Sequence, residues 1–261
     1  MENKSLELNT AILAAKEAGK MLKDYFDGEF SDQEIKDDST IVTVADKKAE
    51  EIIKGIILDS FPNHSILGEE EGLVENSSEY VWHVDPVDGT RNFANGIPLY
   101  CVSIALEKDS EIIVGVVYNP STDRMFYAEK GFGTWLNDKK VSVSGQDHTQ
   151  GMFTIGSGRK EEDLTLKIEL LRNGKTFVRS VRDFGCTALE LAYLASGGTE
   201  AFILLGLNTY DFAAGVFLVE EAGGRITNLD GSKWYFPDNY FLASNGVFHE
   251  DLLENINKLR K

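Results

Sequence analysis

Apolar residues near the start of the chain recur at the spacing of an amphipathic α-helix. One face of a helix predicted over Leu6–Phe26 carries Leu8, Ile12, Ala15, Ala18, Leu22 and Tyr25. A second helix is predicted with a capping-box start around Asp46 and an end at Pro62, from the apolar residues Ala49, Ile52, Ile53, Ile56 and Ile57. The polar stretch 31–40 between the two helices is expected to be a loop.

Beyond residue 62 the pattern changes to short runs of β-type residues separated by turn residues. These runs predict a hairpin with its turn at Asn137-Asp138 and, before it, strands at 80–85, 99–106, 112–118 and 124–128. From Met152 onward strands alternate with helices. The later strands are expected from Met152 and at 176–180, 199–205 and 241–243, and the helices at 161–171, 188–195, 212–222 and from Glu250.

The order of these elements predicts an α/β fold built of layers. The first half combines a helix pair with a mainly antiparallel sheet, whereas the second half alternates strands with helices. No Pro/Ser-rich linker or low-complexity tract separates the halves, and the 261 residues include only 5 Pro. We therefore expect one domain over 1–261 with two lobes, about 1–150 and 151–261.

Composition and charge exclude several classes of protein. The chain carries 26 basic and 43 acidic residues, a net charge of −17, which disfavours partners such as nucleic acid or an anionic membrane. An acidic chain can still bind a small phosphorylated molecule if metal ions supply positive charge. Cys101 and Cys186 have no ligand-like spacing and are expected to be reduced core thiols. Without a signal-peptide pattern or a long apolar run, we expect a soluble, cytoplasmic protein.

Carboxylates gather in three short segments, at 68–72 (GEEEG), 82–90 (WHVDPVDGT) and 210–215 (YDFAAG). In the second segment, Pro86 favours an extended Asp85, and glycine at 89 permits a tight turn. Asp85 and Asp88 can then face one point, with the Val87 carbonyl between them. Hard, anionic oxygen ligands of this kind suit Mg²⁺.

Each of these acids also has a simpler interpretation when taken alone. Asp88 before Gly89 is typical of a structural turn. Asp46 fits the third helical position of a capping box, and Asp211 fits an acid at a helix N-terminus. The glutamates at 69–71 are typical of a solvated loop. Their joint occurrence at strand ends and helix starts favours an active site instead.

Four segments resemble the signatures of the inositol monophosphatase family: 85–90 (DPVDGT), 68–70 (GEE), 42–46 (VTVAD) and 210–215. The resemblance covers nearly the whole chain, because the intervening lengths and the segment 220–224 (EEAGG) also fit. Members of that family are Mg²⁺-dependent, Li⁺-sensitive phosphatases. The resemblance implies an αβαβα sandwich, two or three Mg²⁺ per site and a homodimer.

The resemblance also implies a set of metal ligands. Glu69, Asp85 and the Val87 carbonyl would hold a first metal, and Asp85, Asp88 and Asp211 a second. A third, more weakly bound metal would contact Glu69 through a water molecule. Two metals about 3.5–4 Å apart can activate water and stabilise both oxygens of an in-line displacement, so this ligand set is chemically coherent.

Catalytic and substrate-binding residues are implied in the same way. The catalytic residues would be Asp46, Glu69 and Thr90, with Thr90, oriented by Asp46, taking part in activation of the nucleophilic water. The substrate would contact Asp88, Gly89, Thr90, Gly185, Thr187 and Asp211, and the backbone amides of Gly89 and Thr90 would touch the phosphate.

The choice of substrate stays open at the sequence level. Inositol phosphatases carry a glutamate for the ring hydroxyls seven positions before the last motif aspartate, where this chain has Leu204. The small residue that usually follows the turn at Gly185 is also altered, to Cys186-Thr187. Inositol 1-phosphate is the first expectation, and fructose 1,6-bisphosphate or histidinol phosphate are the alternatives. Candidate contacts are Ser157, Arg159 and Arg182.

Two functions without catalysis are the remaining alternatives. The chain could be a regulatory relative that binds a partner, or a structural Ca²⁺-binding protein that Ca²⁺ stabilises against heat. A decayed enzyme should have lost at least one residue of the implied site. All of them are present, which favours the phosphatase: Asp46, Glu69, Asp85, Asp88, Thr90 and Asp211.

Overall fold

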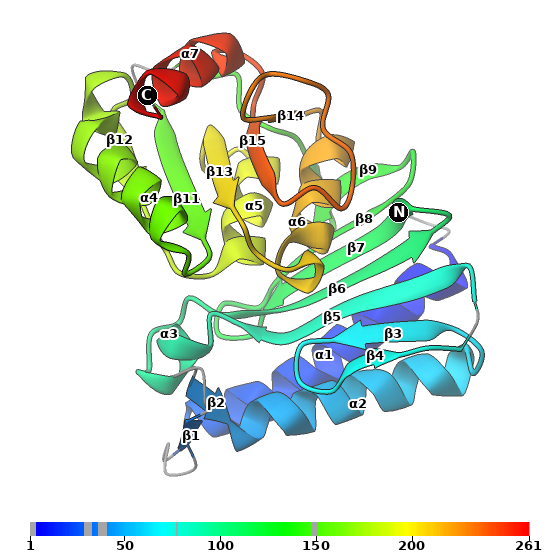
Figure 1. Cartoon of the computed structure of the whole chain (residues 1–261). Helices are drawn as coiled ribbons and strands as arrows, with labels where there is room; N and C mark the ends of the chain where they lie inside the picture. Colours follow the sequence, from blue (N-terminus) through cyan, green and yellow to red (C-terminus); the bar gives the residue numbers. More distant parts are fainter. Residues whose placement is uncertain (1–3, 29–32, 36–40, 77, 148–150, 261) are drawn as a thin grey trace.

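The computed structural model describes residues 4–28, 33–35, 41–76, 78–147 and 151–260. In this part of the chain, helices and sheets alternate in layers, and a helix pair separates a large sheet from a small one (Figure 1). The expected αβαβα sandwich is confirmed. The expected division into lobes near residue 150 stays a prediction.

The first layer is a pair of long helices, α1 (Leu6–Phe26) and α2 (Val44–Ser60). The Ser5 hydroxyl accepts a hydrogen bond from the N–H of Leu8 and so caps α1. The predicted α1 face is the one that is buried against the large sheet. The hairpin of β1 (Gln33–Ile35) and β2 (Ile41–Thr43) leads into α2, and residues 31, 32 and 36–40 of the expected loop lie outside the described residues.

The large sheet has the strand order β10-β9-β8-β7-β6-β5-β3-β4 and is antiparallel except for the parallel pair β3 and β5. Its strands are β3 (Ser65–Gly68), β4 (Gly72–Val74), β5 (Tyr80–Asp88), β6 (Cys101–Lys108), β7 (Glu111–Asn119), β8 (Arg124–Glu129), β9 (Gly133–Leu136) and β10 (Lys139–Val141). In strand β6, alternate side chains pack into two different hydrophobic cores, one on each face of the sheet. Val102 and Ile104 pack toward α1 and α2, whereas Cys101 and Ala105 face the opposite layer, as the two-residue period requires.

The middle layer consists of α5 (Thr187–Ala195) and α6 (Thr209–Glu221). Nearly every residue of α5 and the central run 212–219 of α6 are buried because a sheet covers each side of the helices. The short helix α3 (Thr90–Ala94) follows β5 at the edge of this layer. The middle layer therefore brings helix N-termini next to the end of β5.

The small sheet has the order β12-β11-β13-β15-β14, and β12, β11 and β13 run parallel. Its strands are β11 (Met152–Ser157), β12 (Ser180–Arg182), β13 (Ala201–Leu205), β14 (Arg225–Asn228) and β15 (Tyr240–Ser244). Helices α4 (Glu161–Asn173) and α7 (His249–Leu259) form the outermost layer, with α4 followed by a short 3-10 turn, η1 (Gly174–Thr176).

Some sequence predictions for elements were wrong. The segment expected as a strand at 176–180 is the end of a 3-10 turn followed by irregular backbone. The strand itself, β12, begins only at Ser180, where the chain starts to pair with β11. Five short strands were missed, β1 within the expected loop and β2, β3, β4 and β14, since runs of three or four residues are too short to show a period. No helix in the described ranges combines the length and apolarity needed to cross a membrane.

Candidate active site

Strand β5 carries two of the predicted ligands at its carboxyl end. Asp85 pairs with Ser103 of β6 and Asp88 pairs with Cys101, so β5 contains one extra residue between these two pairs. Pro86 lies in this bulge and has no N–H to donate to the sheet. The N–H of Val87 instead donates to Asp85 Oδ1 at 3.0 Å. The bulge therefore fixes the Asp85 carboxylate and lets both aspartates occupy the same end of the strand.

Glycine is required directly after this strand. Gly89 has φ of 88°, in the left-handed region that other residues resist. A Cβ at this position would also lie 2.7 Å from the Leu99 carbonyl oxygen. The turn at Gly89 reverses the chain tightly enough for Thr90 to begin α3 immediately beside Asp88.

The neighbouring strand β3 brings Glu69 to the same place. Because β3 runs parallel to β5, both strands end at the same edge of the large sheet. The N–H of Glu69 donates to the Val84 carbonyl at 3.1 Å and continues the pairing for one residue past β3. Glu69 is thereby placed alongside Asp85, which the large separation in sequence does not reveal.

The middle layer contributes Asp211. This residue lies in the first turn of α6, where its Oδ2 accepts a hydrogen bond from the N–H of Asn208 at 2.7 Å. The capping interaction fixes the carboxylate at the helix N-terminus through its Oδ2. Asp211 is half-buried, next to the end of β5.

Burial and mutual repulsion set the electrostatics of these carboxylates. Asp85 is 1% exposed, and burial raises its pKa well above the usual range, with further increases from the charges of Glu69, Asp88 and Asp211. Burial also raises the pKa of Asp211 well above its usual range, followed by the charges of Asp88 and Glu69. Four acids from three distant segments therefore share one electrostatic environment.

This arrangement fits divalent cations. Like charges held together at a largely buried place are costly unless a counter-charge joins them. The donor atoms are carboxylate oxygens, with the Val87 carbonyl beside them, and such hard ligands suit Mg²⁺. The sequence prediction that Glu69, Asp85, Asp88 and Asp211 lie together agrees with their electrostatic coupling.

The N-terminus of helix α5 binds the remaining predicted ligand, Asp88. Asp88 Oδ1 accepts the N–H of Thr187 at 3.1 Å, and Oδ2 accepts the N–H of Ala188 at 2.6 Å. These donors belong to the first turn of α5, where backbone N–H groups have no partner within the helix. Burial raises the pKa of Asp88, but these hydrogen bonds oppose the increase. The N–H of Thr187, predicted as a substrate contact, is thus committed to Asp88.

Sequence reasoning missed that the two cysteines meet here. Their Sγ atoms are 3.6 Å apart, both thiols are buried, and Cys186 Sγ lies 3.3 Å from Asp88 Oδ2. The two thiols and Asp88 have donor atoms within 4.8 Å of one another. Burial raises the pKa of both thiols, so they act as S–H donors to Asp88 and not as thiolate ligands. The expectation of free, reduced core thiols is consistent with this contact.

The predicted catalytic residues Thr90 and Asp46 lie at helix starts. The Thr90 hydroxyl donates to the Val87 carbonyl at 3.0 Å, which links α3 back to the bulge. Asp46 is the third residue of α2, the position that a capping box requires, and only 2% of it is exposed. Orientation of Thr90 by Asp46 stays a prediction.

A pocket of about 370 Å³ opens beside the carboxylates. Gly89, Thr90 and Gly185 line it, so three predicted substrate contacts share one cavity. Two lining residues are joined by a hydrogen bond, since the Asn92 side chain donates to the Phe184 carbonyl at 2.7 Å. The lining also includes two basic residues, Arg91 and Arg159, and one acid, Asp183.

Of the other candidate contacts, the structure brings only Arg159 to this pocket. Ser157 lies at the end of β11, and Arg182 lines a separate hollow with Lys175 and Arg179. Leu204 is fully buried in the core between the sheets, where it cannot present a polar group to a ligand. The side chain that would replace the family's ring-binding glutamate is therefore part of the hydrophobic packing.

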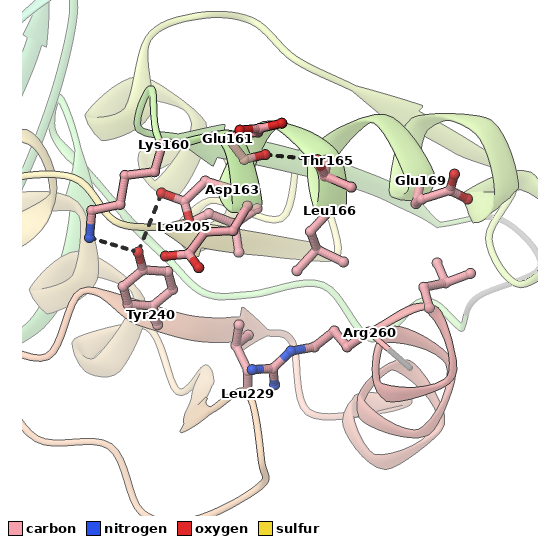
Figure 2. Close-up of a pocket in the computed structure, with 12 residues that line it drawn as sticks. Lys160, Glu161, Asp163, Thr165, Leu166, Glu169, Leu205, Leu229, Tyr240 and Arg260 are labelled. Carbon is pink, nitrogen blue, oxygen red and sulfur yellow. Dashed lines mark hydrogen bonds between the residues drawn. The ribbon is translucent and has the colours of Figure 1, made fainter.

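A second, larger cavity of about 920 Å³ lies between α4 and α7, on the outer face of the small sheet (Figure 2). Leu166, Leu205, Leu229, Glu169 and Arg260 are among its lining residues. Its buried acid, Asp163, accepts a hydrogen bond from the Tyr240 hydroxyl at 3.3 Å, and Lys160 donates to the same hydroxyl at 3.4 Å. We call this cavity the outer groove.

A buried histidine, also missed from the sequence, connects the large sheet to α6. His83 of β5 lies 2.9 Å from the Thr209 hydroxyl through Nδ1 and 2.8 Å from Glu107 Oε2 through Nε2. Thr209 is the first residue of α6 and precedes Asp211 by two positions. The histidine therefore fixes the start of the helix that carries one of the four acids.

Comparison with known proteins gives one consistent result. Residues 3–261 match the model of the inositol monophosphatase family. The chain is 38% identical to an inositol-1-monophosphatase of Mesorhizobium japonicum, covering 98% of this chain and 97% of that protein. It is 34% identical to a fructose-1,6-bisphosphatase/inositol-1-monophosphatase of Aquifex aeolicus, covering 97% and 96%.

The solved structures agree with the sequence relatives. The extragenic suppressor protein suhB of Bartonella henselae superposes with a TM-score of 0.90 at 36% identity, covering 97% of this chain and 99% of that one. A family match over nearly the whole length, together with the grouped motif residues, confirms the resemblance. The chain therefore belongs to the inositol monophosphatase family of phosphoric monoester hydrolases.

Proposed function

We propose that this protein is a Mg²⁺-dependent phosphomonoesterase that hydrolyses a small sugar or polyol phosphate, with inositol 1-phosphate as the first substrate to test. The observation that carries the proposal is the convergence of Glu69, Asp85, Asp88 and Asp211, where burial and mutual repulsion raise carboxylate pKa values near a pocket of about 370 Å³. Perturbed acids next to a cavity are typical of catalytic sites.

The metal-binding residues of this proposal are oxygen donors. Glu69, Asp85 and the Val87 carbonyl would hold one Mg²⁺, and Asp85, Asp88 and Asp211 a second, with a third near Glu69. When bound, Mg²⁺ supplies the positive charge that neutralises the phosphoryl group and lowers the pKa of water. The chain supplies the rigidity: Asp85, Asp88 and Asp211 each accept backbone hydrogen bonds that hold their orientation.

The other residues would position the substrate and the water. The Thr90 hydroxyl is held at the bulge of β5 by its hydrogen bond to the Val87 carbonyl, and from there it would orient a water molecule. Asp46 is buried at the start of α2 and would hold Thr90 in that role. The glycine turns at 89 and 185 line the pocket without side chains, which leaves room for a phosphate oxygen close to the backbone.

A second candidate substrate class is a sugar bisphosphate. Two observations favour it: Arg91 and Arg159 are among the residues that line the pocket, and Leu204 stands where the family has the acid that binds ring hydroxyls. Guanidinium groups pair well with phosphate. A second phosphate would meet these arginines while the first lies at Gly89.

Comparative kinetics at one Mg²⁺ concentration test the proposal. Inositol 1-phosphate, fructose 1,6-bisphosphate and histidinol phosphate are compared by phosphate release, with EDTA and Asp88→Asn as controls. Turnover that EDTA abolishes supports the phosphatase. Equal inactivity under all conditions, with the protein folded, would overturn it in favour of a regulatory binding protein.

Arg91→Ala separates the two substrate classes. If a bisphosphate is the substrate, this change should lower its kcat/KM by about tenfold or more, the value of one charge-assisted hydrogen bond. The matched control is Arg172→Ala, on the exposed face of α4. Unchanged bisphosphate kinetics in Arg91→Ala would remove the bisphosphate proposal. A homodimer and a cytoplasmic location are part of the proposal and rest on the family resemblance.

A further inference from the structure

A buried glutamate outside the predicted site contacts the loop that carries Glu69. Glu50 lies on α2 and is only 1% exposed. Its Oε2 accepts the N–H of Glu70 at 2.8 Å, and its Oε1 accepts the N–H of Glu71 at 3.0 Å. One carboxylate thus holds two successive backbone groups of the acidic loop.

A lysine one turn further along α2 balances this charge. Lys54 Nζ lies 2.7 Å from Glu50 Oε1 and 2.8 Å from Glu71 Oε2. Burial lowers the pKa of Lys54, but its hydrogen bonds and charge attraction to both glutamates more than offset this, and the pKa is raised overall. A charged ammonium therefore sits between α2 and the loop, which allows an acid to be buried beside three other glutamates.

Gly68 makes the close approach of Glu50 to the loop possible. A Cβ on residue 68 would lie 2.4 Å from Glu50 Oε1, so any side chain there would displace the carboxylate. Glycine is therefore required before the acidic triplet because any side chain at position 68 would collide with Glu50. We call Glu50, Lys54 and Gly68 the loop clamp.

The loop clamp fixes Glu69 from both directions. The N–H of Glu69 is bound to Val84 of the sheet, and the next two N–H groups are bound to Glu50 of the helix. Three consecutive peptide groups are therefore oriented by two different layers. The Glu69 carboxylate is left beside Asp85, whose pKa it raises.

We propose that Glu50 is a positioning residue that sets Glu69 for binding of the divalent cation, with Lys54 as its counter-ion. The proposal rests on the proposed function of the Glu69 site. Groups that orient a metal ligand from outside its coordination sphere commonly change metal affinity by about 10–100-fold when removed. Glu50 acts on the ligand through the backbone and contacts neither metal nor substrate.

Glu50→Gln tests this, with Glu51→Gln as the matched control on the same helix, where residue 51 is exposed. Titration calorimetry with Mn²⁺ should give a dissociation constant about 10–100-fold higher for Glu50→Gln and an unchanged one for Glu51→Gln. In EDTA, the amides of residues 70 and 71 should exchange with deuterium faster in Glu50→Gln, because their acceptor is weakened.

Gly68→Ala provides a second route if Glu50→Gln does not fold. The added methyl group displaces the Glu50 carboxylate but removes no charge, so the same loss of Mn²⁺ affinity is expected. Affinity within twofold of the unmodified protein in the folded variant would overturn the proposal. Neither measurement needs turnover, so an inactive but Mn²⁺-binding protein would count against the phosphatase function alone.

Discussion

The outer groove holds about 920 Å³, whereas the pocket beside Gly89 and Gly185 holds about 370 Å³. The buried acid of the larger cavity, Asp163, has a hydroxyl donor in Tyr240. Beside the smaller one, Asp85 and Asp211 have pKa values raised by burial and by neighbouring acids. Cavity size alone would favour the outer groove, whereas the group of carboxylates with raised pKa values favours the smaller pocket as the candidate site.

The origin of the lining residues differs as well. The acids that line the outer groove all belong to one helix, α4, from Glu161 in its first turn to Glu169 further along it (Figure 2). The four acids grouped near the small pocket come instead from distant segments of the chain, namely β5 and the end of β3 in the large sheet and α6 in the middle layer. Acids from two layers that converge on one point repel one another, and a bound cation would offset that repulsion.

Of the substitutions that test the difference between the two cavities, Asp85→Asn should have the largest effect on activity. Asparagine keeps an oxygen that can accept the Val87 N–H, but removes the charge that binds the cation. Phosphatase activity should fall by about a thousandfold, since several kcal/mol of charge stabilisation are lost. The metal-free variant should be more stable than the unmodified protein, because repulsion is relieved.

Asp163→Asn in the outer groove is the control for that change. It removes a buried acid of the same type, and its activity should stay within about twofold. An active Asp85→Asn variant, or an Asp163→Asn variant as inactive as Asp85→Asn, would reverse the assignment of the two cavities.

The stability of the metal-free protein should depend on pH in a defined direction. The raised pKa values of Asp85 and Asp211 mean that the native state keeps protons that the unfolded chain has already released above about pH 4. Stability should therefore fall as pH rises from about 4 toward the raised pKa values, by about 1.4 kcal/mol per pH unit for each retained proton. Thermal unfolding in EDTA between pH 4 and 8 measures this.

Mg²⁺ should counteract that loss. Binding requires ionised carboxylates, so the increase in Tm on addition of Mg²⁺ should grow with pH. The pH dependence in EDTA should also be smaller in Asp85→Asn. A Tm increase that is independent of pH would show that Mg²⁺ stabilises the protein elsewhere.

His83→Phe should have an intermediate effect. It leaves Glu107 and Thr209 without their buried partner, which should destabilise the fold by about 1–3 kcal/mol. Because Thr209 begins the helix of Asp211, activity should also fall, by roughly tenfold at most. Denaturant unfolding and phosphate release measure the two effects.

His64→Phe is the matched control, since His64 accepts a hydrogen bond from Trp82 at 3.1 Å on the side of the sheet away from α6. It should lose stability and keep its activity. Full activity in His83→Phe would mean that the link to α6 is only structural.

The smallest effect is expected from Arg260→Ala in the outer groove. The change should alter stability by no more than about 0.5 kcal/mol and leave activity unchanged, as is usual for surface positions. A loss of activity would indicate that the outer groove takes part in function.

Long periodic elements and local motifs could be predicted from the sequence. The bounds of α1 are those that its apolar face predicts, because helix periodicity is a property of neighbouring residues. The two aspartates of β5 could be predicted as a pair for the same reason, since Pro86 and Gly89 act on adjacent residues. Their positions at strand ends and helix starts favoured a shared active site with Glu69 and Asp211, but the assignment of all four to one set of metal ligands came only from the family resemblance.

Contacts made across layers could not be predicted in this way. The meeting of Cys101 with Cys186 depends on how α5 packs on β6, and no local pattern encodes that packing. In the sequence, Glu50 looks like any other polar residue of a charged helix. Only the structure shows that it contacts the loop after Gly68. The short strand β4 could not be predicted for a different reason, because three residues are too few to show a period.

The central claim is that carboxylates from three segments together hold divalent cations beside the small pocket. Crystals soaked in Mn²⁺ test it directly by anomalous diffraction. The account predicts anomalous peaks bounded by Glu69, Asp85, Asp88 and Asp211. Peaks confined to other acids, such as those of the outer groove, with none at these four residues, would contradict it.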